Sequence, residues 1–287
     1  MSISVLSTIF EDVNRGGSAR LLGVGNDQRY HAFPRDDLIW IDMYRRISSA
    51  SLYGASNADP TLIFVDTTPF AFYDLGGFNG RFLQVSNTGS GERVVNLTDH
   101  GMNDKTSALL MAATGRGSEF RVSFRDVFLD TWRTVLDNQL SGSGASRDGD
   151  PTLTWEMFPQ NVSYLNPNRT YLKIHQNLDI EIDWWPDYVA SITYHLFLYV
   201  TGGNLRGGVH RWAYWIEGGA KSDDIADELE PAVIAGMNTL NDELSRRLSG
   251  FDGFGLDGVY FLPGRQTSPQ STVSGFTTDD VTIVLQL

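Results

Sequence analysis

The stretch FYDLGGFNG, Phe72–Gly80, decides how the first half of the chain is interpreted. Glycines beside an aspartate resemble a phosphate-binding loop, but such a loop must lead into a helix whose first amide groups meet the phosphate. The residues that follow, RFLQVS (81–86), read as a strand instead. We therefore exclude a phosphate loop and expect a folded β-hairpin, in which Gly80 takes a backbone conformation that side chains resist.

The pattern around this stretch occurs twice. IFEDVNRGGSARLL, Ile9–Leu22, aligns with Phe72–Val85 when Phe10 is set on Tyr73 and Gly17 on Gly80. A second marker recurs in the same order, because RRISSASL (45–52) aligns with DKTSALLM (104–111). The two markers predict a repeated unit of about four strands. One sheet cannot bury its own apolar face, so the two units are expected to pack as a sandwich.

The repeat resembles the Greek-key motif of the βγ-crystallins: an aromatic residue, four residues, a second aromatic, one residue and a glycine. The second copy matches at all three places, with Tyr73, Phe78 and Gly80. The first copy departs from the motif at its second aromatic, where Arg15 stands. The resemblance covers residues 1–115 and implies an all-β double Greek-key sandwich there. Such modules occur as calcium binders, in adhesion proteins and in microbial toxins.

The resemblance also implies a calcium site. The family's calcium motif is Asn/Asp, Asn/Asp, two residues, Ser/Thr, Ser, and NDKTSA (103–108) fits it except at Ala108. In the family the two loops exchange ligands, which implies two sites that each draw on both repeats, and we expect one of them to bind calcium here. Its ligands would be the Asp104 carboxylate, the Asn103 backbone carbonyl, the Ser48 hydroxyl and a carbonyl near Glu11. Oxygen donors of these kinds suit calcium. The alternative is that this segment is only an Asx- and Ser-rich turn.

The twin site, implied at Tyr44, Arg45 and Ser107, departs from the motif. The first copy reads YRRISS (44–49) and keeps both serines but neither acidic position. Arg45 places a permanent positive charge where a cation would bind. We therefore expect the twin site to bind no calcium, and we consider that Arg45 substitutes for the second ion.

Composition limits the possible partners. The net charge of -13 argues against nucleic acid, since phosphate binding needs clustered Lys and Arg. No cysteine is present, so disulfides and thiolate metal sites are excluded. No apolar run is long enough for a membrane helix, and no signal peptide is visible, which leaves the localisation open. The negative charge is concentrated after Ala112–Glu119, which predicts a domain boundary there, with domains 1–115 and 116–287.

The sequence of the second half predicts an α+β domain with an antiparallel sheet and two helices. Phe124–Leu140 has apolar residues at helical spacing, with Ser123 as a plausible N-cap. Asp223–Leu248 is acidic in its first turn and basic in its last, as a helix favours, although Pro231 could kink or divide it. Strands are expected over the following four segments: 171–183, a hairpin over Val189–Gly219 that turns at Gly202–Gly208, GVYFLPG (258–264) and DDVTIVLQL (279–287).

The histidines of this half raise the possibility of an enzyme. Two cross-strand rows are conceivable on the polar face of the 172–216 sheet: His175, Tyr199 and His210 in one, and Asp179, His195 and Tyr214 in the next. Imidazole titrates near neutrality and could perform acid/base chemistry or hold a metal. The rows depend on a guessed register, and a slip of one residue moves every side chain to the other face.

Aromatic residues are concentrated in the second half. WWPDY (184–188) and WAYW (212–215) hold four of the seven tryptophans. They either fill a core or contact a partner, and Pro186 favours an exposed turn for the first. The sequence thus favours a non-enzymatic, calcium-stabilised binding or toxin-like protein whose second half contacts a glycan, a protein or a membrane surface. The alternatives are an enzyme acting on the polar sheet face, or a membrane-active protein in which the hairpin over 191–215 inserts.

Overall fold

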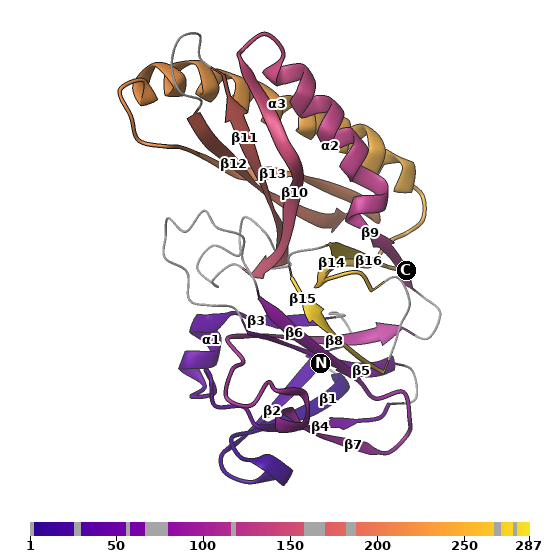
Figure 1. Ribbon diagram of the computed structural model, residues 1–287. Coiled ribbons are helices and arrows are strands. Elements are labelled where there is room, and N and C mark those ends of the chain that lie inside the picture. Colours follow the sequence, from indigo (N-terminus) through magenta and orange to yellow (C-terminus); the bar gives the residue numbers. More distant parts are fainter. Residues whose placement is uncertain are drawn as a thin grey trace.

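The computed structural model describes residues 3–25, 30–55, 58–66, 80–115, 119–157, 170–181, 188–266, 271–277 and 280–287. Within these residues the fold is mostly antiparallel β-structure in four sheets, with three α-helices (Figure 1). Of the hairpin stretch FYDLGGFNG only Gly80 is described. The residues WWPD (184–187) also lie outside the described part of the chain.

Two sheets form the first half. The first sheet holds four strands in the order β2 (Ala19–Gly25), β1 (Ile3–Phe10), β4 (Ser49–Tyr53) and β7 (Glu92–Asn96). The second sheet holds five in the order β15 (Thr272–Phe276), β6 (Arg81–Ser86), β5 (Ala58–Asp66), β8 (Ala108–Gly115) and β3 (Tyr30–Phe33). Short helical segments connect them: η1 (Val13–Arg15), α1 (Arg35–Trp40) and η2 (Leu97–His100).

Each of the two sheets contains strands from both sequence repeats. β7 belongs to the second repeat but pairs with β4 of the first, while β3 belongs to the first repeat and pairs with β8 of the second. Each repeat therefore contributes its third strand to the sheet of the other. The two repeats cannot separate without breaking strand pairing in both sheets.

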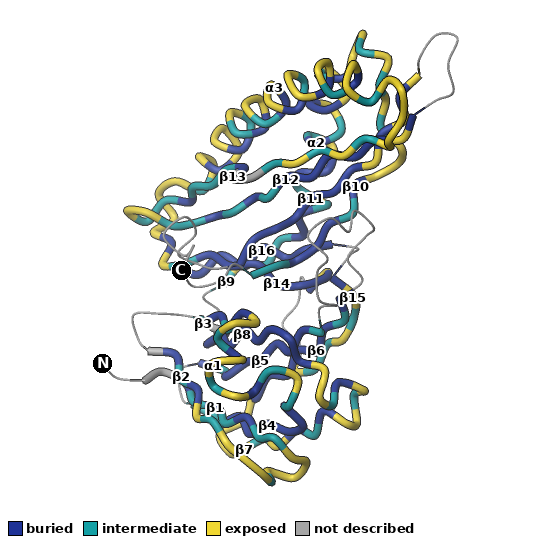
Figure 2. Tube along the Cα trace, turned by 90° about the vertical axis from the view of Figure 1, so that its left-hand side faces the viewer, coloured by how far each residue is buried: buried dark blue, intermediate teal, exposed yellow. Residues whose placement is uncertain are grey.

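The second sheet is buried on both faces. Leu62 and Phe64 of β5 belong to the core between the first two sheets, whereas Ile63 and Val65 belong to the large core of the second half. This explains the apolar run LIFV (62–65) within β5, since a strand covered on both sides needs no polar alternation. Figure 2 shows the buried strands stacked through the middle of the molecule.

Two further sheets and two helices form the rest. The third sheet has the order β14 (Gly258–Pro263), β16 (Val281–Gln286) and β9 (Glu119–Ser123). The fourth has the order β10 (Ala145–Met157), β11 (Thr170–Ile180), β12 (Tyr188–Thr201) and β13 (Asn204–Ile216). The helices are α2 (Phe124–Leu140) and α3 (Ser222–Leu248), which is followed by η4 (Ser249–Phe251).

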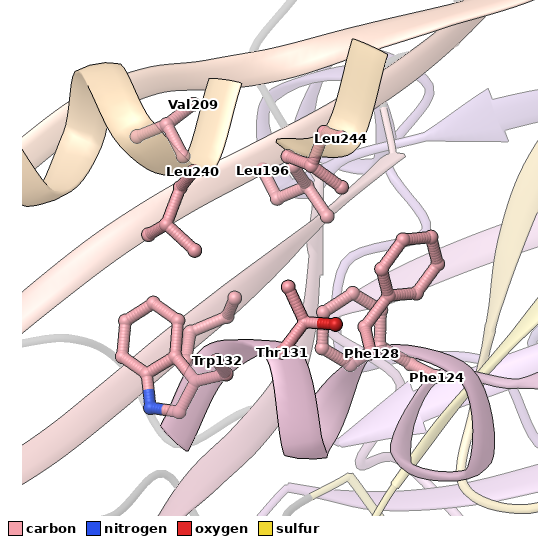
Figure 3. A pocket seen from close by; sticks show the side chains of 9 residues that line it. Phe124, Phe128, Thr131, Trp132, Leu196, Val209, Leu240 and Leu244 are labelled. Atoms are coloured by element: carbon pink, nitrogen blue, oxygen red, sulfur yellow. The ribbon is translucent and has the colours of Figure 1, made fainter. Parts of the chain in front are cut away.

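Helices α2 and α3 cover one face of the fourth sheet (Figure 1). Ile174 and Leu196 of the sheet meet Trp132 of α2 and Leu240 of α3 around an apolar cavity of about 20 Å³ (Figure 3). Trp132 also donates its indole N–H to Gln176 Oε1 at 3.2 Å. The predicted helix over 124–140 is confirmed.

The local predictions of the second half meet mixed outcomes. Ser123 caps α2 as expected, accepting the Asp126 N–H at 3.2 Å. Pro231 neither ends nor divides α3, which is one helix from Ser222 to Leu248. The hairpin turn is shorter than predicted: only Gly202 and Gly203 separate β12 from β13, and both have positive φ. Two residues of this kind match the twist of the flanking strands, so the later glycines are free to belong to β13.

Two observations concern the first half and its boundary. Gly80 does not have the expected left-handed backbone; a Cβ there would lie 2.7 Å from Thr277 Oγ1, so the close approach of that segment requires the glycine. Thr277 directly follows β15, which pairs with β6. The second sheet therefore contains residues from both sides of the predicted boundary at 115/116. The division into two domains stays a prediction.

Candidate metal centre and a buried polar cluster

Two of the four predicted calcium residues, Asn103 and Asp104, lie in the turn between η2 and β8. Met102 anchors this turn, being fully buried and donating its N–H to the Leu97 carbonyl at 2.9 Å. Asp104 has a left-handed backbone with φ of 53°. Aspartate is among the few residues that adopt this conformation at modest cost. The turn therefore holds its carboxylate in a defined place.

Ser48 and Asp104 meet across the two repeats. The Ser48 hydroxyl donates to Asp104 Oδ1 at 3.0 Å, and the Asp104 N–H donates to the Ile47 carbonyl at 3.2 Å. Ser48 is only 5% exposed, so its hydroxyl has little freedom. Two of the four predicted ligands, 56 residues apart in the sequence, are thus brought into direct contact.

Asn103 contacts this pair through its side-chain nitrogen. Its side-chain amide donates to Asp104 Oδ2 at 2.7 Å. Its Oδ1 is buried and finds no hydrogen-bond partner among the described residues. A buried carbonyl oxygen without a donor favours a positively charged neighbour. The donor set of carboxylate, hydroxyl and amide oxygens therefore fits a hard cation such as calcium.

Glu11 lies next to the same segment but is already bound. The Ser48 N–H donates to the Phe10 carbonyl at 3.0 Å, which places Glu11 beside Ser48. The Glu11 carboxylate accepts a hydrogen bond from the Arg46 guanidinium and another from the Ser18 N–H at 3.4 Å. These bonds, the one from Arg46 first, lower the pKa of Glu11 below its ordinary value.

The twin position is built in the same way. The Arg45 N–H donates to the Thr106 carbonyl at 2.9 Å, the counterpart of the Asp104 bond, and Arg45 also has φ of 53°. Its guanidinium lies 3.6 Å from Asp66 Oδ1 and 5.8 Å from the centre of the Tyr44 ring. The Ser107 hydroxyl donates to the Val65 carbonyl at 3.0 Å. At the twin position the positive side chain of Arg45 thus lies beside the Asp66 carboxylate.

The predicted histidine rows on the fourth sheet are wrong. His175 of β11 pairs with Thr193, not Tyr199, and Asp179 pairs with Val189. His195 pairs with Lys173 on one side and Arg211 on the other. The error comes from the positions of the turns: the true partners of His175 and Asp179 lie six residues before the guessed ones, and β12 turns into β13 at Gly202 and Gly203 rather than over Gly202–Gly208. Between β12 and β13 the register also shifts by one residue at His210, which forms a β-bulge.

A different polar cluster lies on the sheet face opposite the helices. Glu156 of β10 accepts a hydrogen bond from the Tyr171 hydroxyl and lies 3.7 Å from Lys173 Nζ. The Tyr171 and His195 rings are 5.0 Å apart. Burial raises the pKa of Glu156, while the positive charge of Lys173 and the Tyr171 hydrogen bond oppose that shift. The sequence predictions included His195 but omitted Glu156; the polar residue in the apolar run TLTWEM (152–157) was the available signal.

His175 lies on β11, the strand that also carries Tyr171 and Lys173. Its Nδ1 is 2.9 Å from the Thr193 hydroxyl, and the residue is 7% exposed. Burial lowers the pKa of His175, and the positive charge of Lys173 lowers it further. Buried groups with displaced pKa values are typical of functional sites, although structural clusters displace them too.

The described tryptophans of WAYW occupy two environments. Trp212 is stacked on Tyr214, with ring centres 6.1 Å apart, and packs against the core. Trp215 points to the other face and is 40% exposed. One tryptophan of this motif therefore supports the core, and the other is accessible to a partner.

Comparison with known proteins identifies no relative. No family model matches the sequence, and no curated protein matches it. A crystal structure of lipopolysaccharide binding protein is similar at 7% identity and a TM-score of 0.17, covering 100% of this chain and 50% of that one. The chain thus spans about half the length of that protein. A likeness of this size carries no argument about fold or ligand.

Proposed function

We propose that residues 1–115 form a βγ-crystallin-like double Greek key that binds one calcium ion. The exchange of third strands between the repeats supports the Greek-key assignment, because it ties two similar units into one sandwich. The reciprocal bonds of Asp104 with Ile47 and of Arg45 with Thr106 support it as well, since they relate the two calcium segments by an approximate twofold.

The observation that carries the calcium proposal is the contact between Ser48 and Asp104. Calcium would be held by the Asp104 carboxylate, the Ser48 hydroxyl and the oxygens of Asn103, with Glu11 at the edge of the site. Among the described residues no three Asp, Glu, His or Cys side chains gather around one point. Hydroxyl, amide and main-chain oxygens would therefore supply most ligands, which is typical of weak calcium sites.

Isothermal titration calorimetry of the full chain tests this proposal. We expect one calcium ion per chain in the wild type and at least about a tenfold loss of affinity in Asp104→Asn, which keeps the shape but removes the charge. Asparagine is preferred to alanine because it tolerates the left-handed backbone. Asp99→Asn, an exposed carboxylate in η2, is the matched control and should bind as the wild type does. Equal affinity in Asp104→Asn, or no binding by the wild type at millimolar calcium, would exclude the site.

For the second half we propose contact with a glycan, protein or membrane-surface partner. Trp215 supports this, because it is exposed near the end of β13. In the described residues no helix is long and apolar enough to cross a membrane. Leakage from liposomes with and without calcium tests membrane activity, and Trp215→Ala should reduce it if this surface is used. Binding without leakage would favour a glycan or protein partner instead.

A second candidate function is acid/base catalysis on the fourth sheet. It is favoured by the buried contact of Glu156 with Tyr171 and Lys173, since a carboxyl group with a raised pKa is suited to proton transfer. A screen with chromogenic esters and glycosides tests it, comparing Glu156→Gln with the exposed control Glu228→Gln. Activity that survives Glu156→Gln unchanged would exclude this site.

A further inference from the structure

Arg46 is paired with Glu11, which lies beside the proposed calcium site. Its guanidinium contacts two carboxylates: Glu11, and Asp42 with an N–O distance of 2.5 Å. Arg46 stands two residues before Ser48, whose hydroxyl contacts Asp104. A positive charge supplied by the chain is therefore fixed to one member of the proposed ligand set.

The backbone explains why this contact forms. The bond from the Ser48 N–H to the Phe10 carbonyl draws Glu11 alongside the segment that carries Arg46. Asp42 holds the other side of the guanidinium from the preceding turn, where its own φ is 58°. Arg46 thus has two anchors, of which only Glu11 belongs to the calcium site.

At the twin position an acidic residue is likewise paired with an arginine, but this arginine is not the counterpart of Arg46. There Asp66, the last residue of β5, is paired with Arg45, whereas Glu11 directly follows β1. Lys105, the counterpart of Arg46, instead donates to the Gly101 carbonyl at 3.0 Å. In both repeats an acidic residue at the end of the first strand has an arginine partner, but only at Glu11 does the neighbouring loop also offer the Asp104 carboxylate.

We propose that Arg46 is an internal competitor of calcium, whose guanidinium must leave Glu11 before the ion binds with full affinity. This inference rests on the calcium site proposed above. The Arg46 side chain is 40% exposed, so it can move away from Glu11 while it stays bonded to Asp42. A divalent cation and a guanidinium repel each other, so the charge of Arg46, held at Glu11 beside Ser48, opposes an ion bound there.

The competition predicts that the guanidinium of Arg46 lowers the affinity for calcium. Linked binding events of this kind commonly change an affinity by about 5- to 150-fold. Removing the guanidinium should therefore strengthen calcium binding, whereas a purely structural role of the ion pair predicts unchanged or weaker binding.

Calorimetric calcium titration of the full-length Arg46→Gln variant, with circular dichroism as a check on folding, tests the inference. We expect an affinity about tenfold above that of the wild type and a larger rise of the melting temperature on adding calcium. Arg46→Lys, which keeps the charge, should bind within about twofold of the wild type. Arg15→Gln is the matched control, because Arg15 pairs with Glu92 outside the site, 3.0 Å away, and it should also stay within about twofold.

The outcomes separate the two proposals. Binding by the wild type with equal or lower affinity in Arg46→Gln overturns the competition but leaves the calcium site standing. An equal gain in Arg15→Gln also overturns it, because net charge alone would then explain the effect. Absence of binding in the wild type, Arg46→Gln and Arg46→Lys alike overturns the calcium site itself. Binding by Arg46→Gln alone supports the competition but overturns the proposed binding of calcium by the wild type.

Discussion

Arg45→Asp should give the chain a second calcium site. Arg45 and Asp104 occupy equivalent places, with the same φ of 53° and matching backbone bonds. Aspartate fits this backbone at least as well as arginine does. The substitution would place a new carboxylate next to Asp66 and Ser107, in the arrangement that Asp104 has with Glu11 and Ser48.

The cost without calcium can be worked out from the contacts that are lost. The Arg45–Asp66 pair is separated by 3.6 Å with side chains 39% and 26% exposed, so its loss costs about 0.5 kcal/mol. Loss of the Tyr44 cation–π contact at 5.8 Å costs about 0.5 kcal/mol. Repulsion between the two carboxylates adds about 1 kcal/mol. The calcium-free variant should therefore be about 2 kcal/mol less stable than the wild type.

Calcium should reverse this loss. At a concentration 100 times the dissociation constant, one additional ion stabilises the folded state by about 2.7 kcal/mol. Urea unfolding with chelator and with calcium measures both quantities, and calorimetry counts the ions. Arg45→Gln is the control, since it removes the cation without adding a ligand and should still bind one ion. A folded Arg45→Asp that binds only one ion would refute the equivalence of the two positions.

Three further substitutions test the packing and the titration of the second half by unfolding measurements. Ser123→Ala should destabilise the protein by about 2 kcal/mol, because it removes the cap for the Asp126 N–H and the hydrogen-bond donor to buried Asp280; an effect below about 0.5 kcal/mol would contradict this. Thr131→Val should stabilise by about 1 kcal/mol, because Oγ1 is buried beside the apolar cavity and, within the described part of the chain, has no hydrogen-bond partner (Figure 3). The pKa of His175 is below its ordinary 6.5, so its neutral form contributes stability that is lost as the pH falls below 6.5 through the folded pKa; His175→Gln should flatten this part of the pH profile, and an unchanged slope would argue against it.

The features that the sequence predicted correctly depend on neighbouring residues. Helix α2 follows from apolar spacing and a cap that involves only Ser123 and Asp126. The Ser48–Asp104 contact was implied by the resemblance of the repeat to the βγ-crystallins, in which the two loops exchange ligands. In both cases the relevant information is contained in a short stretch or in a comparison of two stretches.

The features that escaped prediction depend on distant partners. The histidine rows failed because the register depends on where each turn lies, and the partners of His175 and Asp179 on β12 lie six residues before the guessed ones. The pairing of β15 with β6 joins segments nearly two hundred residues apart, and no local pattern specifies it. The Arg46–Glu11 contact was missed for the same reason, since the sequence shows charges but not which of them meet.

The central claim, that the two repeats share one calcium site, is tested most directly by a double-mutant cycle between Ser48 and Asp104. Calcium affinity is measured for the wild type, Ser48→Ala, Asp104→Asn and the double variant. If both residues hold the same ion, the losses are not additive, and the coupling should reach about 1 kcal/mol. Additive losses, or a loss in only one single variant, would contradict a site built jointly by the two repeats.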